Sequence, residues 1–316
     1  MKRPLVILTG PTAVGKTKAS IGLAKEIGGE IISADSMQVY RHMDIGSAKI
    51  TASEMQGIKH HLIDVLSPEE EFHVAKFQEL AKKAAEEIYL AGHIPIVAGG
   101  TGFYIQALLY DIDFSKGDEN KEYREEMMQA ALVKGPEYVH GLLKKADPKS
   151  ADTIHPNNVK RVVRALEYYH QTGERISVHN ETQQKRTSPY QSAYFVLNDE
   201  RSHLYERIDR RVDQMLDYGL VEEVKALKTM GYTRELVSMQ GLGYKEILAY
   251  LEGECTLEEA VYTIKRDTRH FAKRQITWFK RERDVIWLNK QDYGYDEEKL
   301  LQEMLRVLRE RNIISC

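Results

Sequence analysis

Eight residues near the start of the chain have the types and the spacing of a phosphate-binding loop: they read G-P-T-A-V-G-K-T over 10–17. Glycines at both ends let successive backbone N–H groups and a helix N-terminus point at one anion. The lysine adds a positive charge, and the last threonine hydroxyl can ligand Mg²⁺ that the anion holds. The sequence therefore predicts a site for a diphosphate or triphosphate, with Mg²⁺ as cofactor and Thr17 as its protein ligand. The residues predicted to hold the phosphates are Gly10, Pro11, Thr12, Ala13, Val14, Gly15, Lys16 and Thr17.

Two further polar residues directly follow segments that are expected to be buried strands. Asp35 follows E-I-I-S-A at 30–34, and Thr101 lies in the G-G-T-G turn after the apolar segment 94–98. Since the carboxyl ends of parallel strands line the ligand crevice of such sheets, both side chains are expected near the phosphate loop. Asp35 could otherwise be a simple turn residue, and the glycine turn could serve only helix–strand packing.

Basic residues gather in two later segments. Arg207 and Arg211 are four apart on one face of an expected helix, a spacing suited to a diphosphate, although Arg210 competes for the role. Residues 265–283 hold eight Lys or Arg and two acidic residues, a local net charge of +6. Such a cluster in a chain of net charge −3 favours polyanion binding. The cluster residues predicted to contact RNA phosphates are Arg269, Lys273 and Lys280.

Composition limits the class of protein. The chain has 316 residues, 42% apolar and 29% charged, which is typical of a globular protein with one or two domains. Cys255 and Cys316 have neither disulfide nor metal-site spacing, which favours a reducing cytoplasm. No apolar run approaches the roughly 18 residues that a membrane span needs, so no membrane partner is expected.

The periodicity of apolar residues predicts an α/β protein with a parallel sheet flanked by helices and a helical insertion. Strands are expected at 4–9, 30–34, 94–98, 193–197 and 285–288. Helices are expected at 16–27, 74–90, 103–109, 157–171, 204–216, 257–283 and 296–313. The domain boundaries that follow are 1–114 for the first part of the core, 115–191 for the insertion and 192–316 for the second part. His60 and His61 lack ligand spacing and are predicted to be structural.

Seven segments together resemble one family, the bacterial tRNA dimethylallyltransferases (tRNA isopentenyltransferases). The phosphate loop is shared with many families, but the later segments are more specific, and the resemblance covers nearly the whole chain in consistent order. These later segments are A-D-S-M-Q-V-Y at 34–40, H-H-L-I-D at 60–64, G-G-T-G at 99–102, N-V-K-R-V-V-R-A-L-E at 158–167, G-L-G-Y-K at 241–245 and A-K-R-Q-I-T-W-F at 272–279.

The resemblance implies a nucleotide-kinase-like fold and transfer of the dimethylallyl group from dimethylallyl diphosphate to N6 of the adenosine just 3′ of the tRNA anticodon. It makes Asp35 the general base, gives Thr101 a role in acceptor contact and catalysis, and assigns the phosphate loop to the donor diphosphate. It further implies contacts to the extruded base and the anticodon arm by Asp35, Ser36, Met37, Gln38, Thr101, Val159, Lys160, Arg161, Val162, Val163, Gln240, Gly241, Leu242, Gly243, Tyr244 and Lys245.

Two other classes of function remain possible from the residues alone. A small-metabolite kinase would use the same loop for ATP, with Asp35 as the base for a hydroxyl, but the +6 segment would be superfluous. An RNA-binding P-loop protein without group transfer would leave Asp35 and Thr101 without a task. The prenyltransferase hypothesis uses all these features, and it is expected to describe a cytoplasmic, monomeric enzyme whose partners are tRNA and dimethylallyl diphosphate.

Overall fold

The computed structural model describes residues 2–114 and 121–315, which form two compact units. The sheet-bearing unit comprises Met1–Leu109 and Pro189–Cys316, and the helical unit comprises Tyr110–Ser188. The expected first boundary, after residue 114, borders on residues 115–120, which lie outside the described residues, as does Cys316. The structure divides the chain earlier, at Leu109, where helix α4 ends. Residues 190 and 191, expected in the insertion, belong to the sheet because a strand begins at Tyr190.

The sheet has six strands, all parallel, in the order β3-β2-β4-β1-β5-β6. The strands are β1 (Arg3–Thr9), β2 (Gly29–Ala34), β3 (His60–His61), β4 (Ile94–Gly99), β5 (Tyr190–Asn198) and β6 (Val285–Asn289). Five of them are the strands expected from the sequence, and the sixth, β3, is too short to produce a pattern. Its His61 Nε2 lies 2.7 Å from the buried carboxylate of Glu30, in line with a structural role.

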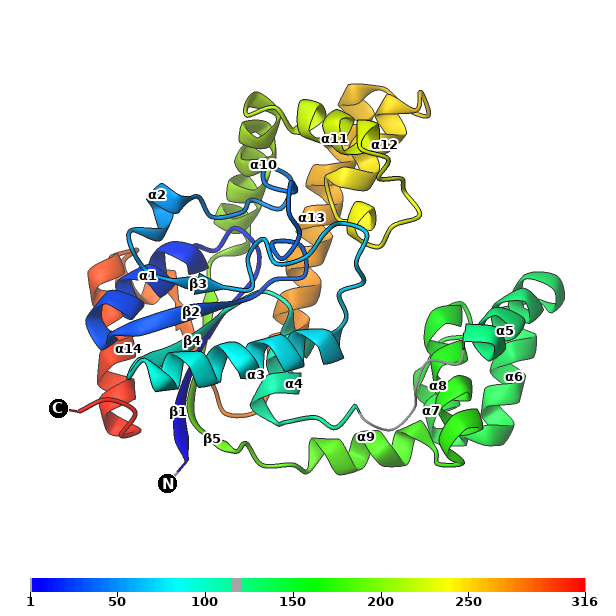
Figure 1. Cartoon of the computed structure of the whole chain (residues 1–316), viewed down its shortest axis with the longest axis horizontal. Helices are drawn as coiled ribbons and strands as arrows, with labels where there is room; N and C mark the ends of the chain where they lie inside the picture. Colours follow the sequence, from blue (N-terminus) through cyan, green and yellow to red (C-terminus); the bar gives the residue numbers. More distant parts are fainter. Residues whose placement is uncertain (1, 115–120, 316) are drawn as a thin grey trace. The chain divides into compact units, whose positions relative to one another are not determined.

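Both faces of the sheet are covered, as the apolar composition of its strands requires. Val6 and Leu8 of β1 belong to a core cluster with α1 (Lys16–Ile27) and α14 (Glu297–Glu310). Leu5 and Ile7 point to the opposite face and are equally buried. In Figure 1, α3 (Val74–Leu90) lies across that second face, in front of the strands, and contacts β2 and β4.

The remaining helices of this unit are α2 (Ala52–Met55), α4 (Gly102–Leu109), α10 (Arg201–Asp217), α11 (Leu220–Thr229), α12 (Tyr244–Leu251) and α13 (Leu257–Phe279), with short 3₁₀ turns at Ser238–Gln240 and Lys290–Tyr293. In Figure 1, α10 to α13 extend beyond the carboxyl ends of the strands, whereas α4 lies beside α3 and packs against it. Helix α13 ends four residues before the expected end at residue 283, and Lys280 is its C-cap. Helices α10 and α13 pack against each other, linked by the ion pair between Lys265 and Asp213.

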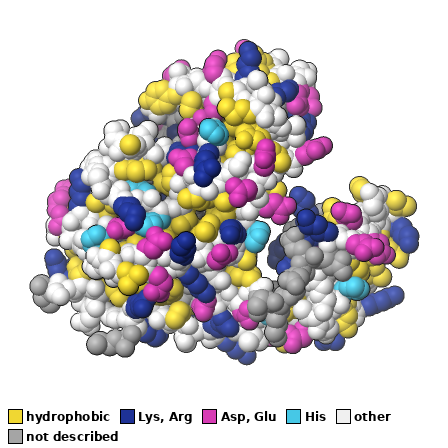
Figure 2. All heavy atoms as spheres, viewed as in Figure 1, with side chains coloured by type: hydrophobic (Ala, Val, Ile, Leu, Met, Phe, Trp, Pro, Cys, Tyr) yellow, Lys and Arg dark blue, Asp and Glu magenta, His cyan; other side chains and the backbone are white. Residues whose placement is uncertain are grey.

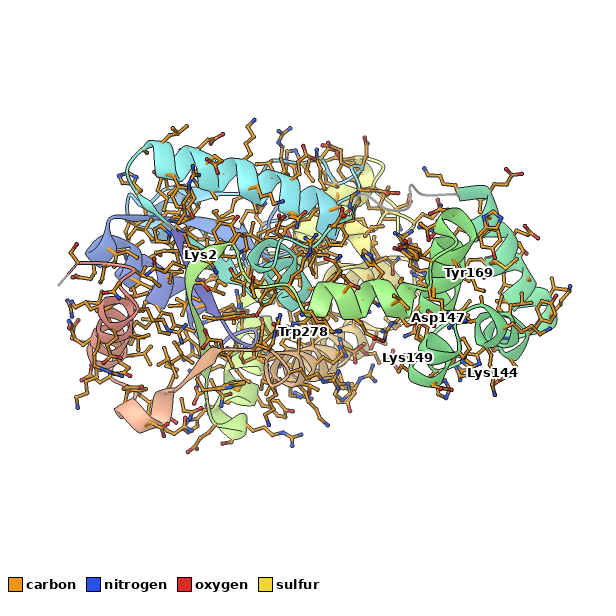
Figure 3. The ribbon with its side chains drawn as sticks, turned by 90° about the horizontal axis from the view of Figure 1, so that it is seen from below. Lys2, Lys144, Asp147, Lys149, Tyr169 and Trp278 are labelled. Atoms are coloured by element: carbon orange, nitrogen blue, oxygen red, sulfur yellow. The ribbon has the colours of Figure 1, made fainter. Side chains whose placement is uncertain are left out.

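The helical unit has its own core. Its helices are α5 (Lys121–Lys134), α6 (Pro136–Ala146), α7 (Pro148–Thr153), α8 (Val159–Thr172) and α9 (Ile176–Gln184). Asp147, labelled in Figure 3, is fully buried and accepts four hydrogen bonds from the backbone and hydroxyl groups of Ser150 and Ser177. These bonds hold the pKa of Asp147 below its usual value against the opposing effect of burial. One carboxylate thereby joins the N-terminal turns of α7 and α9.

On one face of the sheet-bearing unit, charges of both signs are interspersed. Figure 2 shows Lys and Arg side chains interspersed with Asp and Glu over the visible face of the sheet-bearing unit. This distribution agrees with the net charge of −3, so a polyanion would have to bind to a local group of basic residues. Among the described residues, no helix combines the length and the apolar character that crossing a membrane requires.

Candidate active site

The sheet brings the three predicted chemical elements to one edge. Strands β2, β4 and β1 are neighbours, and they end at Ala34, Gly99 and Thr9 respectively. Because the strands are parallel, the residues that follow them emerge side by side. The phosphate loop, Asp35 and Thr101 accordingly line one cavity of about 890 Å³. This is within the size range of cavities that bind small molecules.

The phosphate loop adopts the tight turn that its glycines allow. Gly10 has φ +147° and Gly15 has φ +103°, values that favour glycine. A Cβ added to Gly10 would lie 2.4 Å from the carbonyl oxygen of Leu197, so no larger residue fits there without movement. Val14 is fully buried and anchors the turn in the core of the sheet-bearing unit. The loop is thus anchored in the core on one side and borders the cavity on the other.

Lys16 is placed to meet an anion. Its ammonium donates to the carbonyl oxygens of Gly10 and Pro11 at 3.0 and 2.8 Å. Burial lowers its pKa to about 8; the charge of Asp35 opposes this shift, and the charge of Arg211 adds to it. A buried ammonium that has lost most of its water gains more from a bound anion than an exposed one.

The structure distinguishes the three candidate arginines of α10. Arg207 donates from Nε to the carbonyl of Ala13 at 2.8 Å. Arg211 lies one turn further along α10 and lines the cavity, and burial lowers its pKa. Arg210 forms an ion pair with Glu206 at 2.7 Å. Arg207 and Arg211 are therefore the two best placed beside the phosphate loop.

Asp35 has one oxygen engaged by the backbone. Its Oδ1 accepts from the N–H groups of Met37 at 2.8 Å and Gln38 at 3.3 Å. No other hydrogen bond of this carboxylate is formed with the described residues, which leaves Oδ2 to accept a proton from a ligand. Lys16 and Arg211 are close enough to interact with its charge.

Thr101 directly precedes helix α4, and both its N–H and its carbonyl oxygen form backbone hydrogen bonds. Its N–H donates to Ala34 at 3.2 Å, and its carbonyl accepts from Tyr104 and Ile105 at 3.0 and 3.2 Å. Its hydroxyl has no hydrogen-bond partner among the residues that the structure describes, and the residue lines the cavity. A fixed backbone with an available hydroxyl is suited to contacting a ligand.

The rest of the cavity has apolar and aromatic lining residues and an excess of basic ones. Tyr40, Phe72 and Tyr104 form one aromatic group, in which the rings of Phe72 and Tyr104 are 5.4 Å apart, edge to face. Helices α10 and α13 contribute Ile208, Val212, Met215, Ile264 and Phe271. Among the described residues that line it, Asp35 is the sole acid, against the six cations Lys16, Arg207, Arg210, Arg211, Lys245 and Arg274.

Glu223 shapes this cavity from outside it. Its carboxylate accepts from the backbone N–H groups of residues 44–46 at 2.7–3.0 Å and from the hydroxyl of Tyr244 at 2.8 Å. That hydroxyl accepts from the N–H of Ser47 at 3.1 Å. The loop so fixed supplies Gly46, Ser47 and Ala48 to the cavity wall. Nothing in the spacing of Glu223 indicates this role in advance, since its backbone partners at 44–46 lie nearly 180 residues away in the chain.

Three residues predicted to contact RNA have buried side chains. Val162 and Val163 are 0% and 1% exposed, in the core of the helical unit, whereas Lys160 and Arg161 beside them are exposed. Tyr244 is also fully buried and bonded to Glu223. Each is an apolar or aromatic residue on the buried face of its helix, so only its backbone could reach a ligand.

The other residues predicted to contact RNA belong to both units. Ser36, Met37, Gln38, Gln240, Gly241, Leu242, Gly243 and Lys245 line the cavity together with Asp35 and Thr101. Val159 is half-buried at the start of α8.

The basic face of α13 is partly neutralised. One terminal nitrogen of Arg269 donates to both carboxylate oxygens of Asp209, at 2.5 and 2.8 Å, so its charge is already matched. Lys273 and Lys280 are exposed, and neither forms an ion pair with a described residue. They are the stronger candidates for phosphate contacts.

Comparison with known proteins agrees with this geometry. The family model for IPP transferase matches residues 38–282, more than half of the chain. The chain belongs to the IPP transferase family. A relative from Lachnoclostridium phytofermentans, named tRNA dimethylallyltransferase, is 64% identical over 99% of this chain and 100% of its own length. One of the same name from Acetivibrio thermocellus is 52% identical over 93% of this chain and 94% of its own length.

Solved structures of IPP transferases share the fold. The full-length tRNA isopentenylpyrophosphate transferase of Bacillus halodurans is 45% identical, with a TM-score of 0.74 and coverage of 98% of both chains. A eukaryotic dimethylallyltransferase acting on tRNA is 30% identical, with a TM-score of 0.81 over 96% of this chain and 78% of that one. The family resemblance and the α/β fold expected from the sequence are thereby confirmed.

Proposed function

We propose that this chain transfers the dimethylallyl group from dimethylallyl diphosphate to N6 of the adenosine 3′-adjacent to the anticodon of tRNA. The observation that carries this proposal is the placement of Asp35 and Thr101 opposite a phosphate loop in one cavity with apolar walls. That arrangement offers a leaving-group site, a proton acceptor and room for an apolar tail within reach of one another.

The donor is activated by departure of its diphosphate. As the C–O bond breaks, negative charge builds on the leaving oxygen, and preorganised positive groups stabilise it. Lys16, Arg207 and Arg211 lie beside the loop and supply this charge. Thr17 lines the same cavity, and its hydroxyl is a ligand type that Mg²⁺ accepts alongside phosphate oxygens. Mg²⁺, bound there, would neutralise part of the diphosphate charge.

Asp35 takes the proton that the acceptor must lose. The exocyclic amine of adenine forms a bond to the allylic carbon and becomes a cation unless a base removes a proton. Asp35 Oδ2 is unengaged, while the Oδ1 bonds to Met37 and Gln38 hold the carboxylate in a fixed orientation. The hydroxyl of Thr101 is placed to orient the adenine or its amine.

The apolar walls suit the prenyl tail and exclude water. A carbon centre that loses diphosphate reacts with any water present, so the site must be dry when the reaction occurs. The side chains of α10 and α13 and the aromatic group around Tyr104 provide such surface. A base extruded from a single-stranded loop reaches such a cavity at a cost of a few kcal/mol.

The kinase alternative is not favoured, and one paired incubation tests it directly. The chain is incubated with unmodified tRNA and Mg²⁺, once with labelled dimethylallyl diphosphate and once with γ-labelled ATP. We expect label to enter the RNA only from the prenyl donor, and nucleoside analysis to find it on adenosine. Transfer of phosphate from ATP, with no prenyl label in RNA, would instead support the kinase. Lys16→Ala should abolish prenyl transfer while tRNA binding persists.

A further inference from the structure

One buried side chain joins the donor loop to the acceptor turn. Gln275, on α13, is 6% exposed and lies between the phosphate loop and the turn that carries Thr101. Its Oε1 accepts from the backbone N–H of Thr12 at 2.8 Å. Its Nε2 donates to the carbonyl of Gly100 at 2.9 Å. A glutamine amide is the side chain that can accept from one backbone segment and donate to another at once.

The contact is tight enough to fix the neighbouring residues. A Cβ added to Gly100 would lie 2.3 Å from Gln275 Nε2, so a side chain at this position would have to displace the amide. One turn further along α13, Trp278, labelled in Figure 3, covers Gly102, where an added Cβ would lie 2.2 Å from the indole ring. Helix α13 therefore contacts the turn on both sides of Thr101.

We propose that Gln275 is a positioning residue for prenyl transfer, which sets the distance between the donor diphosphate and the residue that contacts the acceptor. The inference rests on the proposed function. Gln275 touches no reacting atom: it acts through Thr12 on the loop and through Gly100 on Thr101. Because rate falls steeply when reacting groups are misplaced by about 1 Å, loss of this link should slow the chemical step more than it weakens binding.

The test compares two buried glutamines by the same substitution. Gln275→Glu keeps an acceptor for the N–H of Thr12 but sets a carboxylate oxygen against the carbonyl of Gly100. Gln78→Glu is the matched control, because Gln78 is 9% exposed and donates to the carbonyl of Ala107, at the far end of α4. Single-turnover transfer to tRNA, binding of inorganic diphosphate with Mg²⁺ by calorimetry, and the unfolding midpoint are measured for both.

We expect the single-turnover rate of Gln275→Glu to fall by about 100-fold, with a much smaller change in diphosphate affinity. Gln78→Glu should lower the unfolding midpoint and leave the rate at the wild-type value. Equal rates for the two variants would overturn the inference, because loss of a buried hydrogen bond alone would then explain the effect.

A double variant keeps the inference testable if Gln275→Glu does not fold. Gly100→Ala should displace the amide of Gln275 and so reproduce the loss caused by Gln275→Ala. In Gln275→Ala the obstruction is gone, since the next nearest atom outside Gln275 is the oxygen of Gly10 at 3.7 Å. The double variant should thus lose no more of the single-turnover rate than either single variant does. Additive losses of rate would contradict the link through Gln275.

Failure of the proposed function would look different. A wild-type chain that transfers no prenyl group would refute that function. The link through Gln275 would still be tested by Gly100→Ala and Gln275→Ala. If the link exists, the effects of these two substitutions on diphosphate affinity should not add.

Discussion

The charge state of Lys16 should control how donor affinity depends on pH. In the free protein, burial lowers the pKa of this ammonium to about 8. An anion bound in the loop favours the charged form and raises that pKa. Since the group is charged below its free-state pKa and neutral above it, diphosphate should bind well near pH 7 and progressively less well above pH 8.

The size of the effect follows from the same pKa. A group with a pKa of about 8 is about nine-tenths charged at pH 7 and about one-tenth charged at pH 9. If only the charged form binds tightly, affinity for diphosphate should fall about tenfold between these pH values. At pH 9, binding should also take up close to one proton per site, because most Lys16 side chains must be protonated as the anion arrives.

Calorimetry with inorganic diphosphate and Mg²⁺, in buffers of different ionisation enthalpy, measures both the affinity and the proton uptake. Lys16→Met is the control, because diphosphate itself titrates in this range and the variant reports that contribution alone. Its affinity should be lower at pH 7 and should lack the part of the pH dependence due to the lysine. The same pH dependence in both proteins, or no proton uptake at pH 9 beyond that of the variant, would refute the assignment.

Three further outcomes are expected. Asp35→Asn keeps the shape of the side chain but not its basicity, so single-turnover prenyl transfer should fall at least about 10²-fold with little change in tRNA affinity; near-normal turnover would exclude Asp35 as the base. Replacing both Lys273 and Lys280 by Ala should reduce the slope of log affinity for tRNA against log salt by about two units. Arg269→Ala, which breaks an ion pair with Asp209, should change the slope less than either lysine does. Glu223→Ala leaves four donors without their acceptor and should destabilise the fold by roughly 1.5–3 kcal/mol, measured by denaturant unfolding.

The central part of the fold follows from local patterns. The strands that become β1, β2, β4 and β5 are short apolar runs bounded by glycines or polar residues, and α1 begins at Lys16 as the phosphate-loop motif requires. In an all-parallel sheet these patterns also fix the edge at which the ligand-binding residues emerge. The predicted convergence of the loop, Asp35 and Thr101 on one cavity needs no further information.

Other features depend on contacts that the sequence does not record. Strand β3 has two residues, too few to show the alternation of apolar and polar residues that marks a strand. It is recognised as a strand only by its pairing with β2. The sequence analysis predicts no helix at 244–251, yet α12 begins at Tyr244, whose hydroxyl donates to Glu223. Val162 and Val163 are expected to contact RNA because they lie in a family motif. The structure shows that they lie on the buried face of α8.

A kinase and a prenyltransferase can share a phosphate loop because both stabilise charge on a leaving or transferred phosphate. What differs is the surface beside the loop. Both reactions need water kept away, but only the prenyl donor carries a short apolar tail that gains from apolar surface beside the loop. Here α10 presents Arg207 and Arg211, four residues apart, to the cavity. The same helix adds three apolar side chains to the cavity wall: Ile208, Val212 and Met215. In the proposed reaction, one helix would supply both positive charge for the departing diphosphate and apolar surface for the prenyl tail, and this pairing favours carbon over phosphoryl transfer at the site.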